Sequence, residues 1–289
     1  MTVDDPTTTL AACSHDSGAS VQWLDQQVDS VLDSVTTDRL QTFKEFVRHG
    51  MFHLGLFRCL NVLRRMRGVQ VSEGSSHAAE TRFKEIYDRG LWVRAEGQES
   101  LSGTGSSRTA TAGLITSLMS GMSSLGCNSL LDVGCGDWNW MQHETLPVDY
   151  VGVDVVESVI ARNQTFSGPR VRFAVCNAIG QPLPSVDMAL CREVLFHLSF
   201  ADARSVLVNI SRSARFLCAT TDVDIRFNSD IPTGDFRPLN LLIRPFGLPM
   251  PQALIPDRAV RPGRFLGVWS SAALSAALSR ECKERPVAH

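Results

Sequence analysis

The sequence predicts an α/β fold, a mostly parallel sheet with helices on both faces, preceded by an N-terminal helical extension. Short apolar strands alternate with amphipathic helices through most of the chain from residue 78 onward. Hydrophobic residues make up 44% of the 289 residues and charged residues 20%. This composition is that of a globular protein whose core needs neither a disulfide nor a metal.

The N-terminal part differs in composition from the rest. Residues 1–20 are rich in Thr, Ser, Ala, Gly and Asp and lack periodicity, so we expect a disordered tail. Residues 21–77 carry apolar positions at helical spacing and are expected to form the helical extension. Residues 38–68 hold seven Lys or Arg. A basic amphipathic helix could lie on an anionic membrane, but we favour a helical cap on the following domain.

Residues 78–289 are expected to form one α/β domain. Residues 223–263 interrupt its alternation of strands and helices with seven prolines, and we expect this insertion to form a lid or a substrate wall. Strands are expected at 130–133, 150–153, 171–175, 188–191, 216–220 and 265–269, and helices around 83–87, at 111–125, from about 138–142, at 156–163 and at 201–213.

A glycine turn ends the first of these strands, in the segment LLDVGCGDWNW at residues 130–140. Its two glycines allow the backbone to approach a ligand closely. Asp154 ends the next strand, where a carboxylate can accept both hydroxyls of a ribose. The third glycine of a dinucleotide fingerprint is replaced by Asn139, which counts against NAD or FAD. The pattern therefore favours a nucleoside without phosphate.

With these motifs in order, residues 129–215 resemble the class I S-adenosylmethionine-dependent methyltransferases, a Rossmann-like family. The resemblance implies that the cofactor is S-adenosyl-L-methionine, with its methionine part near the glycine turn and its ribose on Asp154. It implies an adenine contact at Asn177. The stretch DMALCREVLFHLS at 187–199 is similar to the family's fourth motif, whose strand end lines the active site. The cofactor-binding residues expected from this resemblance are Asp132, Gly134, Gly136, Asp137, Asp154, Asn177 and Cys191.

Methyl transfer from a sulfonium requires the protein to orient the acceptor and, for a hydroxyl, to remove its proton. His197 follows the fourth strand and is the candidate base, or else a structural histidine that caps the turn. Arg192 could hold a substrate carboxylate or phosphate, and Glu193 is a third catalytic candidate. Further candidates near the pocket are Arg237, Asp222, Trp92, Trp138 and Trp140.

Glu193 and His197 lie four residues apart, so on a helix they would share a face. Their segment resembles methyltransferases that bind a divalent metal through Glu-x-x-Glu-His. Phe196 stands in place of the second acid, so the sequence predicts no metal.

The sequence therefore predicts a methyltransferase that acts on a small molecule or glycan, chiefly at oxygen. A net charge of -2 argues against a nucleic-acid partner. One alternative is a catalytically inactive methyltransferase fold that acts as a binding or scaffold protein, and a second is a nicotinamide-dependent oxidoreductase. No secretory pattern, bilayer-spanning run or C-x-x-C pair is visible, and we expect a soluble cytoplasmic protein.

Overall fold

The structure, a computed structural model, describes residues 47, 76–93, 97–257 and 261–284. The predicted tail at 1–20 lies outside these residues. So does the predicted helical extension at 21–77, apart from Val47 and the first turn of α4 (Ser76–Asp88). The domain that follows carries every predicted site residue.

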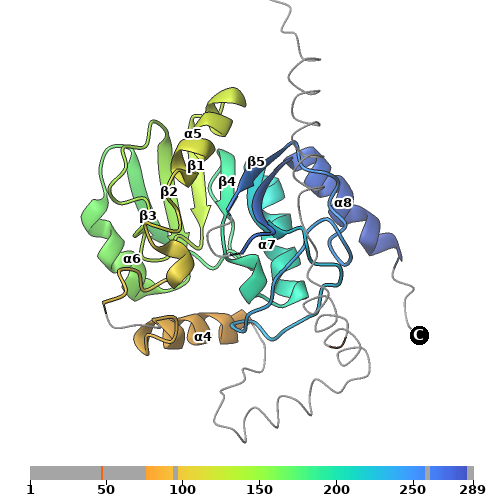
Figure 1. Ribbon diagram of the computed structural model, residues 1–289, viewed down its shortest axis with the longest axis horizontal. Helices are drawn as coiled ribbons and strands as arrows, with labels where there is room; N and C mark the ends of the chain where they lie inside the picture. The colour runs from red at the N-terminus through yellow and green to blue at the C-terminus, as the bar shows by residue number, and fades with distance from the viewer. Residues whose placement is uncertain (1–46, 48–75, 94–96, 258–260, 285–289) are drawn as a thin grey trace, which may run out of the picture.

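A sheet of seven strands forms the centre of the described part of the chain (Figure 1). Its strand order is β3-β2-β1-β4-β5-β7-β6. Strands β1 to β5 are parallel, while β7 runs antiparallel to both of its neighbours. This topology confirms the predicted mostly parallel sheet. The strands are β1 (Ser129–Val133), β2 (Asp149–Asp154), β3 (Val171–Val175), β4 (Val186–Cys191), β5 (Ala214–Asp222), β6 (Ala253–Pro256) and β7 (Arg264–Ser270).

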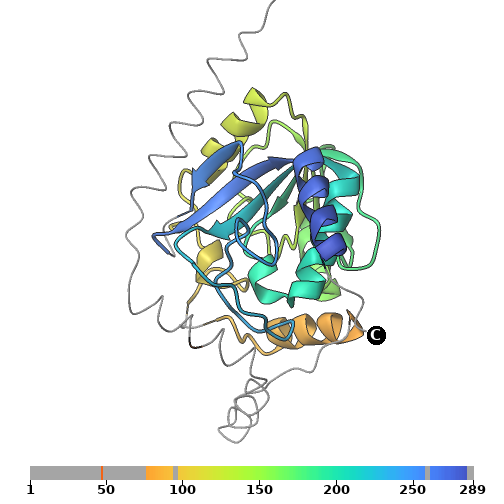
Figure 2. The same cartoon turned by 90° about the vertical axis from the view of Figure 1, so that its right-hand side faces the viewer.

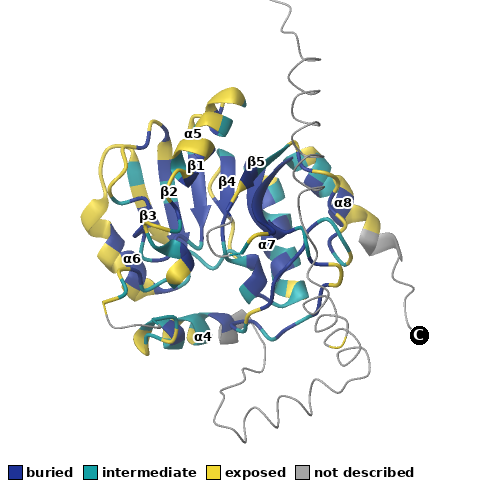
Figure 3. Ribbon diagram, viewed as in Figure 1, coloured by how far each residue is buried: buried dark blue, intermediate teal, exposed yellow. Residues whose placement is uncertain are grey.

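Helices cover both faces of the sheet, as predicted. Figure 2 shows α5 on one side of the sheet, with α7 and α8 on the other. Two apolar clusters follow this division: Leu118 of α5 belongs to one, and Leu207 and Leu274 of α7 and α8 belong to the other. Most strand residues are buried (Figure 3), as expected for a sheet covered on both faces. Besides α4, the helices are α5 (Leu114–Ser124), α6 (Glu157–Asn163), α7 (Phe200–Ser213) and α8 (Ser271–Glu284), with short 3-10 turns η1 (Thr104–Ser106), η2 (Gln164–Phe166) and η3 (Leu195–His197).

Helix α7 shows how the sequence produces these elements. The hydroxyl of Ser199 accepts a hydrogen bond from the backbone N–H of Asp202 and caps the helix. Buried residues then recur at helical spacing through Ala203, Leu207 and Ile210. The capped start and the apolar stripe explain why this helix was predictable from its sequence.

The prediction of a helix that begins near 138–142 is wrong. The chain forms hydrogen-bonded turns there, and no helix lies between β1 and β2. Trp138 has a left-handed backbone with φ of 55°, and its buried ring packs between Tyr150, Phe166 and Phe173. The left-handed residue breaks the helical path. Strand β6 and helix α8 were not predicted.

The insertion at 223–263 packs against the end of β5. Its described residues are largely buried, among them Leu239, Leu241 and Phe246. The backbone of Asp222 at the end of β5 donates to the carbonyl of Leu239, and the N–H of Leu241 donates to the hydroxyl of Thr221. The segment is therefore fixed against the end of β5.

Among the described residues, no helix is both long enough and apolar enough to cross a bilayer.

Candidate cofactor pocket

A pocket opens at the carboxyl ends of β1, β2 and β4, where the order of the sheet reverses. This is the position at which open α/β sheets bind ligands. Helix α4 crosses the strand ends (Figure 1) and lines the pocket through Ala79, Phe83 and Tyr87, one helical turn apart. The space within it that is not filled by atoms is about 970 Å³, open solvent included.

The two glycines of the turn are required by conformation and by space. Gly134 and Gly136 have φ of 73° and 56°, values that side chains rarely allow. A Cβ on Gly134 would lie 2.5 Å from Val194 Cγ2, and one on Gly136 would lie 2.3 Å from Ser102 Oγ. The turn therefore packs directly against the segment after β4 and against the 100–107 loop.

Asp154 closes this turn at the end of β2. Its carboxylate accepts hydrogen bonds from the N–H of Gly136 at 3.1 Å and of Val156 at 3.0 Å. Burial raises its pKa even though these backbone donors act against the shift. Asp154 is also one of the residues that line the pocket.

Asp132 is a second buried acid in the pocket wall. It accepts a hydrogen bond of 2.8 Å from the hydroxyl of Tyr150. Burial raises its pKa to about 7, although the bond from Tyr150 and the charge of Arg192 lower it. Ionising this side chain therefore costs more free energy in the folded protein than in the unfolded chain.

Replacing Asp132 with asparagine is expected to raise the free energy of unfolding at neutral pH by about 1–3 kcal/mol. The folded state keeps the proton to a higher pH than the unfolded state, so stability falls as pH rises through the window from about 4 to the folded pKa of about 7. Asparagine removes this loss and can still accept the bond from Tyr150. Urea unfolding at acidic and neutral pH measures the effect.

Asp187 provides the opposite control. Hydrogen bonds from the backbone of Asn128 and from Arg215 lower its pKa to about 2, so its contribution to stability is present above the unfolded pKa and lost as pH falls. Asp187→Asn should therefore lose stability at neutral pH. A destabilised Asp132→Asn would contradict the account of Asp132.

The other predicted cofactor residues divide into two groups. Asn177 lines the pocket, and its amide donates to Glu80 of α4 at 3.0 Å. Asp137 and Cys191 are not among the lining residues. Cys191 is fully buried at the end of β4, and burial raises its pKa. Asp137 instead binds the 100–107 loop.

That loop is attached to the glycine turn by hydrogen bonds. The carboxylate of Asp137 accepts from the N–H of Leu101 at 2.6 Å and from the hydroxyl of Ser102 at 2.9 Å. Ser102 also contacts the hydroxyl of Tyr87 at 2.8 Å. Together these contacts join α4, the loop and the turn into one wall of the pocket.

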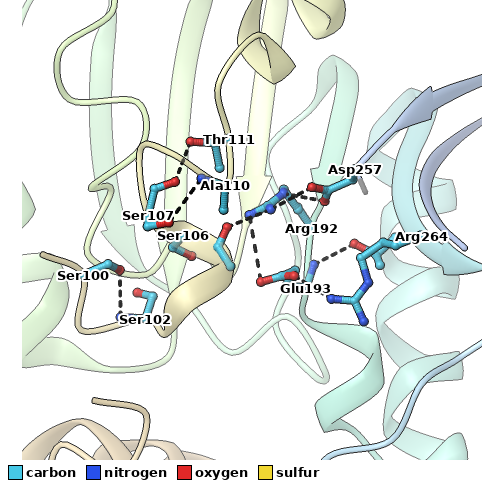
Figure 4. A network of polar contacts seen from close by, with 12 residues as sticks. Ser100, Ser102, Ser106, Ser107, Ala110, Thr111, Arg192, Glu193, Asp257 and Arg264 are labelled. Carbon is cyan, nitrogen blue, oxygen red and sulfur yellow. Dashed lines mark hydrogen bonds and ion pairs between the residues drawn. The ribbon is translucent and has the colours of Figure 1, made fainter. Parts of the chain in front are cut away.

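Arg192 and Glu193 follow β4 and lie in a network of alternating charge (Figure 4). Arg192 forms two hydrogen bonds with Asp257, at 2.8 and 3.0 Å, and donates to the carbonyl of Gly105 at 2.9 Å. Burial acts to lower the pKa of Arg192, but Glu193 and Asp257 raise it on balance. Because Asp257 already neutralises Arg192, the predicted role of binding an anionic substrate finds no support in these contacts.

Glu193 has a left-handed backbone, with φ of 58°, which is rare for a residue other than glycine. Its N–H donates to the hydroxyl of Thr220 at 2.8 Å, and its carboxylate accepts from Arg264 at 2.6 Å. Arg264 in turn pairs with Asp222 at 2.9 Å, directly across the β5–β7 ladder. The network thus fastens the segment after β4 to the β6–β7 hairpin.

Asp257 and Arg264 were missed in the sequence. They lie 65 and 71 residues from their partners Arg192 and Glu193, in a proline-rich stretch. The only local signal was a group of charges beside a strand predicted to be buried. Asp222 belongs to this network and not to the pocket lining.

His197 lies in the pocket wall at the end of η3. Its Nδ1 lies 2.8 Å from the carbonyl oxygen of Asp235. A carbonyl only accepts, so Nδ1 carries the hydrogen and the lone pair of the neutral ring is on Nε2. Burial lowers the pKa of His197 to about 4, so the ring is neutral at physiological pH.

The remaining candidates take different positions. Trp92 and Trp140 line the pocket, and Trp140 also lies under the guanidinium of Arg192 at 5.2 Å. Trp138 and Arg237 are buried outside the lining. Glu193 and His197 do not share a helix face as supposed, since Glu193 precedes a 3-10 turn. Within the described ranges, no group of three His, Cys, Asp or Glu side chains is arranged to hold a metal.

The charge of the pocket distinguishes between nucleotide classes. Of the described residues that line it, Asp132 and Asp154 are acids, while Arg192 and Glu193 are already paired with Asp257 and Arg264. A pyrophosphate needs free cations or a helix N-terminus, and no helix follows the glycine turn. A cationic nucleoside without phosphate fits these residues.

The comparisons agree with this geometry. Residues 131–215 match the family model of the methyltransferase domain. Over these residues the chain is similar to a methyltransferase domain. That domain runs from β1 into β5 and contains Asp132, Gly134, Gly136, Asp154 and His197. The cofactor of this domain class is S-adenosylmethionine. No curated protein matches the chain.

Solved structures resemble the methyltransferase domain weakly. The methyltransferase domain of bacterial CtHen1-C is 16% identical with a TM-score of 0.35, covering 39% of this chain and 66% of that one. Magnesium protoporphyrin IX methyltransferase (ChlM) from Synechocystis PCC 6803, with bound SAH, is 16% identical with a TM-score of 0.38, covering 51% and 72%. Phosphoethanolamine N-methyltransferase 1 of Haemonchus contortus is 16% identical with a TM-score of 0.38, covering 52% and 33%. Resemblance at this level carries no argument about the acceptor.

Proposed function

We propose that this protein is an S-adenosylmethionine-dependent methyltransferase that methylates an oxygen of a small molecule or glycan, with His197 as the base. One observation carries the proposal. The bond from Nδ1 of His197 to the carbonyl of Asp235 leaves the lone pair on Nε2, in the wall of a pocket suited to a cationic nucleoside.

The residues proposed to hold the cofactor are those of the glycine turn and the ends of β1 and β2. The backbone at Gly134 and Gly136 would contact its methionine part, and Asp154 would accept from its ribose hydroxyls. Asn177 would lie beside its adenine. When bound, the cofactor supplies an electrophilic methyl group.

The protein's own contribution is to orient the acceptor, exclude water and remove a proton. Nε2 of His197 would accept the hydroxyl proton, while Trp92 and Asp235 hold the ring in place by stacking at 4.9 Å and by the bond to Nδ1. Arg192 and Glu193 are proposed to position the segment that carries His197, because both are bonded to the β6–β7 hairpin.

Replacing Asp154 with alanine is expected to weaken S-adenosylmethionine binding by about 2 kcal/mol, the scale of hydrogen bonds to a charged group. The ribose loses its acceptor, and the N–H groups of Gly136 and Val156 lose theirs. Isothermal titration of the full chain with S-adenosylmethionine measures the change.

Asp149 is the matched control, because it is an exposed aspartate at the other end of the same strand, paired with Arg170 on the surface. Asp149→Ala should bind the cofactor as the unmodified protein does. Equal affinity in the Asp154 and Asp149 variants would refute the ribose assignment.

A further inference from the structure

A row of aromatic rings extends from the pocket to the surface through His197. The aromatic row consists of Phe83, Tyr87, Trp92, His197 and Phe236. Trp92 stacks on His197 with ring centroids 4.9 Å apart and meets Tyr87 edge-on at 5.4 Å. Phe236 lies 5.7 Å from His197 on the outer side and is 53% exposed. The proposed base is therefore embedded in an aromatic surface.

The polar side chains of the same wall are already bonded within the protein. The hydroxyl of Tyr87 contacts Ser102 at 2.8 Å. Arg192 is bonded to Asp257, and Glu193 is bonded to Arg264. A glycan presents many hydroxyls, whereas this wall offers mainly ring surface and polar groups that already have partners.

From these two observations, and resting on the proposed function, we infer that the methyl acceptor is a flat aromatic compound bearing a hydroxyl group, bound against the aromatic row. Aromatic rings gain from offset or edge-on contact with other rings beyond the burial of their area. The phenol oxygen gains the methyl group as the carbon–sulfur bond breaks with its electron pair on sulfur. The phenol proton passes to Nε2 of His197.

The basicity of His197 agrees with such an acceptor. Burial lowers the pKa of His197 to about 4, so it is a weak base. A phenol, with a pKa of about 10 as in tyrosine, gives up its proton far more readily than an aliphatic hydroxyl, which is about as weakly acidic as water. A weak base therefore suits a phenol better than a sugar.

Calorimetric binding of 2-naphthol, decahydro-2-naphthol and methyl β-glucoside to the full chain saturated with S-adenosylhomocysteine tests the inference. We expect 2-naphthol to bind about tenfold or more tightly than its saturated counterpart, and the glucoside to bind least. Equal binding of 2-naphthol and decahydro-2-naphthol, or tighter binding of the glucoside, would overturn the inference.

Variants of the aromatic row sharpen the test. Trp92→Leu should reduce the preference for 2-naphthol by about tenfold with unchanged affinity for S-adenosylhomocysteine. Phe236→Ala, at a half-exposed position, should reduce it by about threefold. Leu91→Ala changes an exposed apolar residue that is not part of the aromatic row and should have no effect. An unchanged preference in both ring variants would contradict the inference.

The same titrations distinguish a failure of the proposed function from a failure of the inferred acceptor. Failure of S-adenosylhomocysteine to bind the unmodified protein would overturn the proposed function, and the inference with it. Binding of S-adenosylhomocysteine without any preference for the aromatic probe would overturn the inference alone.

Discussion

Replacing His197 with alanine is expected to lower the turnover number of methyl transfer by about 10²- to 10⁴-fold, the usual contribution of a positioned general base. Affinity for S-adenosylmethionine should be retained, since the proposed cofactor contacts lie on the glycine turn and on β2. Turnover with isotopically labelled S-adenosylmethionine, measured beside calorimetric binding, separates these two effects.

An asparagine at the same position distinguishes a base from a structural histidine. The amide of His197→Asn can still donate to the carbonyl of Asp235, which preserves the contact that fixes the insertion. It has no counterpart of Nε2. The asparagine variant should therefore be as slow as the alanine variant, and recovery of turnover would mean that His197 acts only by holding Asp235.

The pH profile gives a second readout of His197. Its pKa of about 4 places the acid limb of kcat/KM well below the range of an ordinary histidine, because protonation of Nε2 abolishes the base. Activity should therefore stay level as the pH falls from neutral to mildly acidic values. An acid limb near the unperturbed histidine pKa of about 6.5 would contradict the neutral ring.

Replacing Asp257 with alanine is expected to destabilise the protein by about 3–5 kcal/mol, since it leaves the charge of Arg192 buried without its partner. Both side chains are almost completely buried, at 0% and 3% exposure. The midpoint of urea unfolding measures the loss. The change should also displace the segment that carries His197.

Two controls separate charge from volume in this prediction. Asp224 pairs with Arg261 at the outer end of the same network, where both side chains are partly exposed, so Asp224→Ala should lose only about 0–1 kcal/mol. The double change Asp257→Leu with Arg192→Met removes both charges and should recover most of the stability. No recovery in the double variant would show that the pair matters for its shape and not for its charge.

The fold was predictable where local pattern and tertiary structure agree. The interior parallel strands β1, β2, β4 and β5 are largely buried apolar runs, and they formed at their predicted places, as did the more exposed edge strand β3. Strand β6 was not predicted because Pro256 and the prolines near it are typical of a loop. The turns at 138–142 were mistaken for a helix because the left-handed backbone of Trp138 depends on how its ring packs in the core. The local sequence does not show that packing.

The site was predictable only where it depends on one segment. Gly134, Gly136 and Asp154 lie within a single strand–turn–strand unit, and the structure brings them together as expected. The partners Asp257, Arg264 and Asp235 come from distant parts of the chain, and only the folded sheet brings them to Arg192, Glu193 and His197. For the same reason the sequence did not reveal that the backbone of the insertion, at the carbonyl of Asp235, bonds to His197.

The central claim is that the turn after β1 holds S-adenosylmethionine. Isothermal titration of the full chain with S-adenosylmethionine and, separately, with NAD⁺ and NADH tests it most directly. The account predicts saturable binding of one S-adenosylmethionine per chain and no binding of either nicotinamide nucleotide. Binding of NAD⁺ or NADH without binding of S-adenosylmethionine would contradict it.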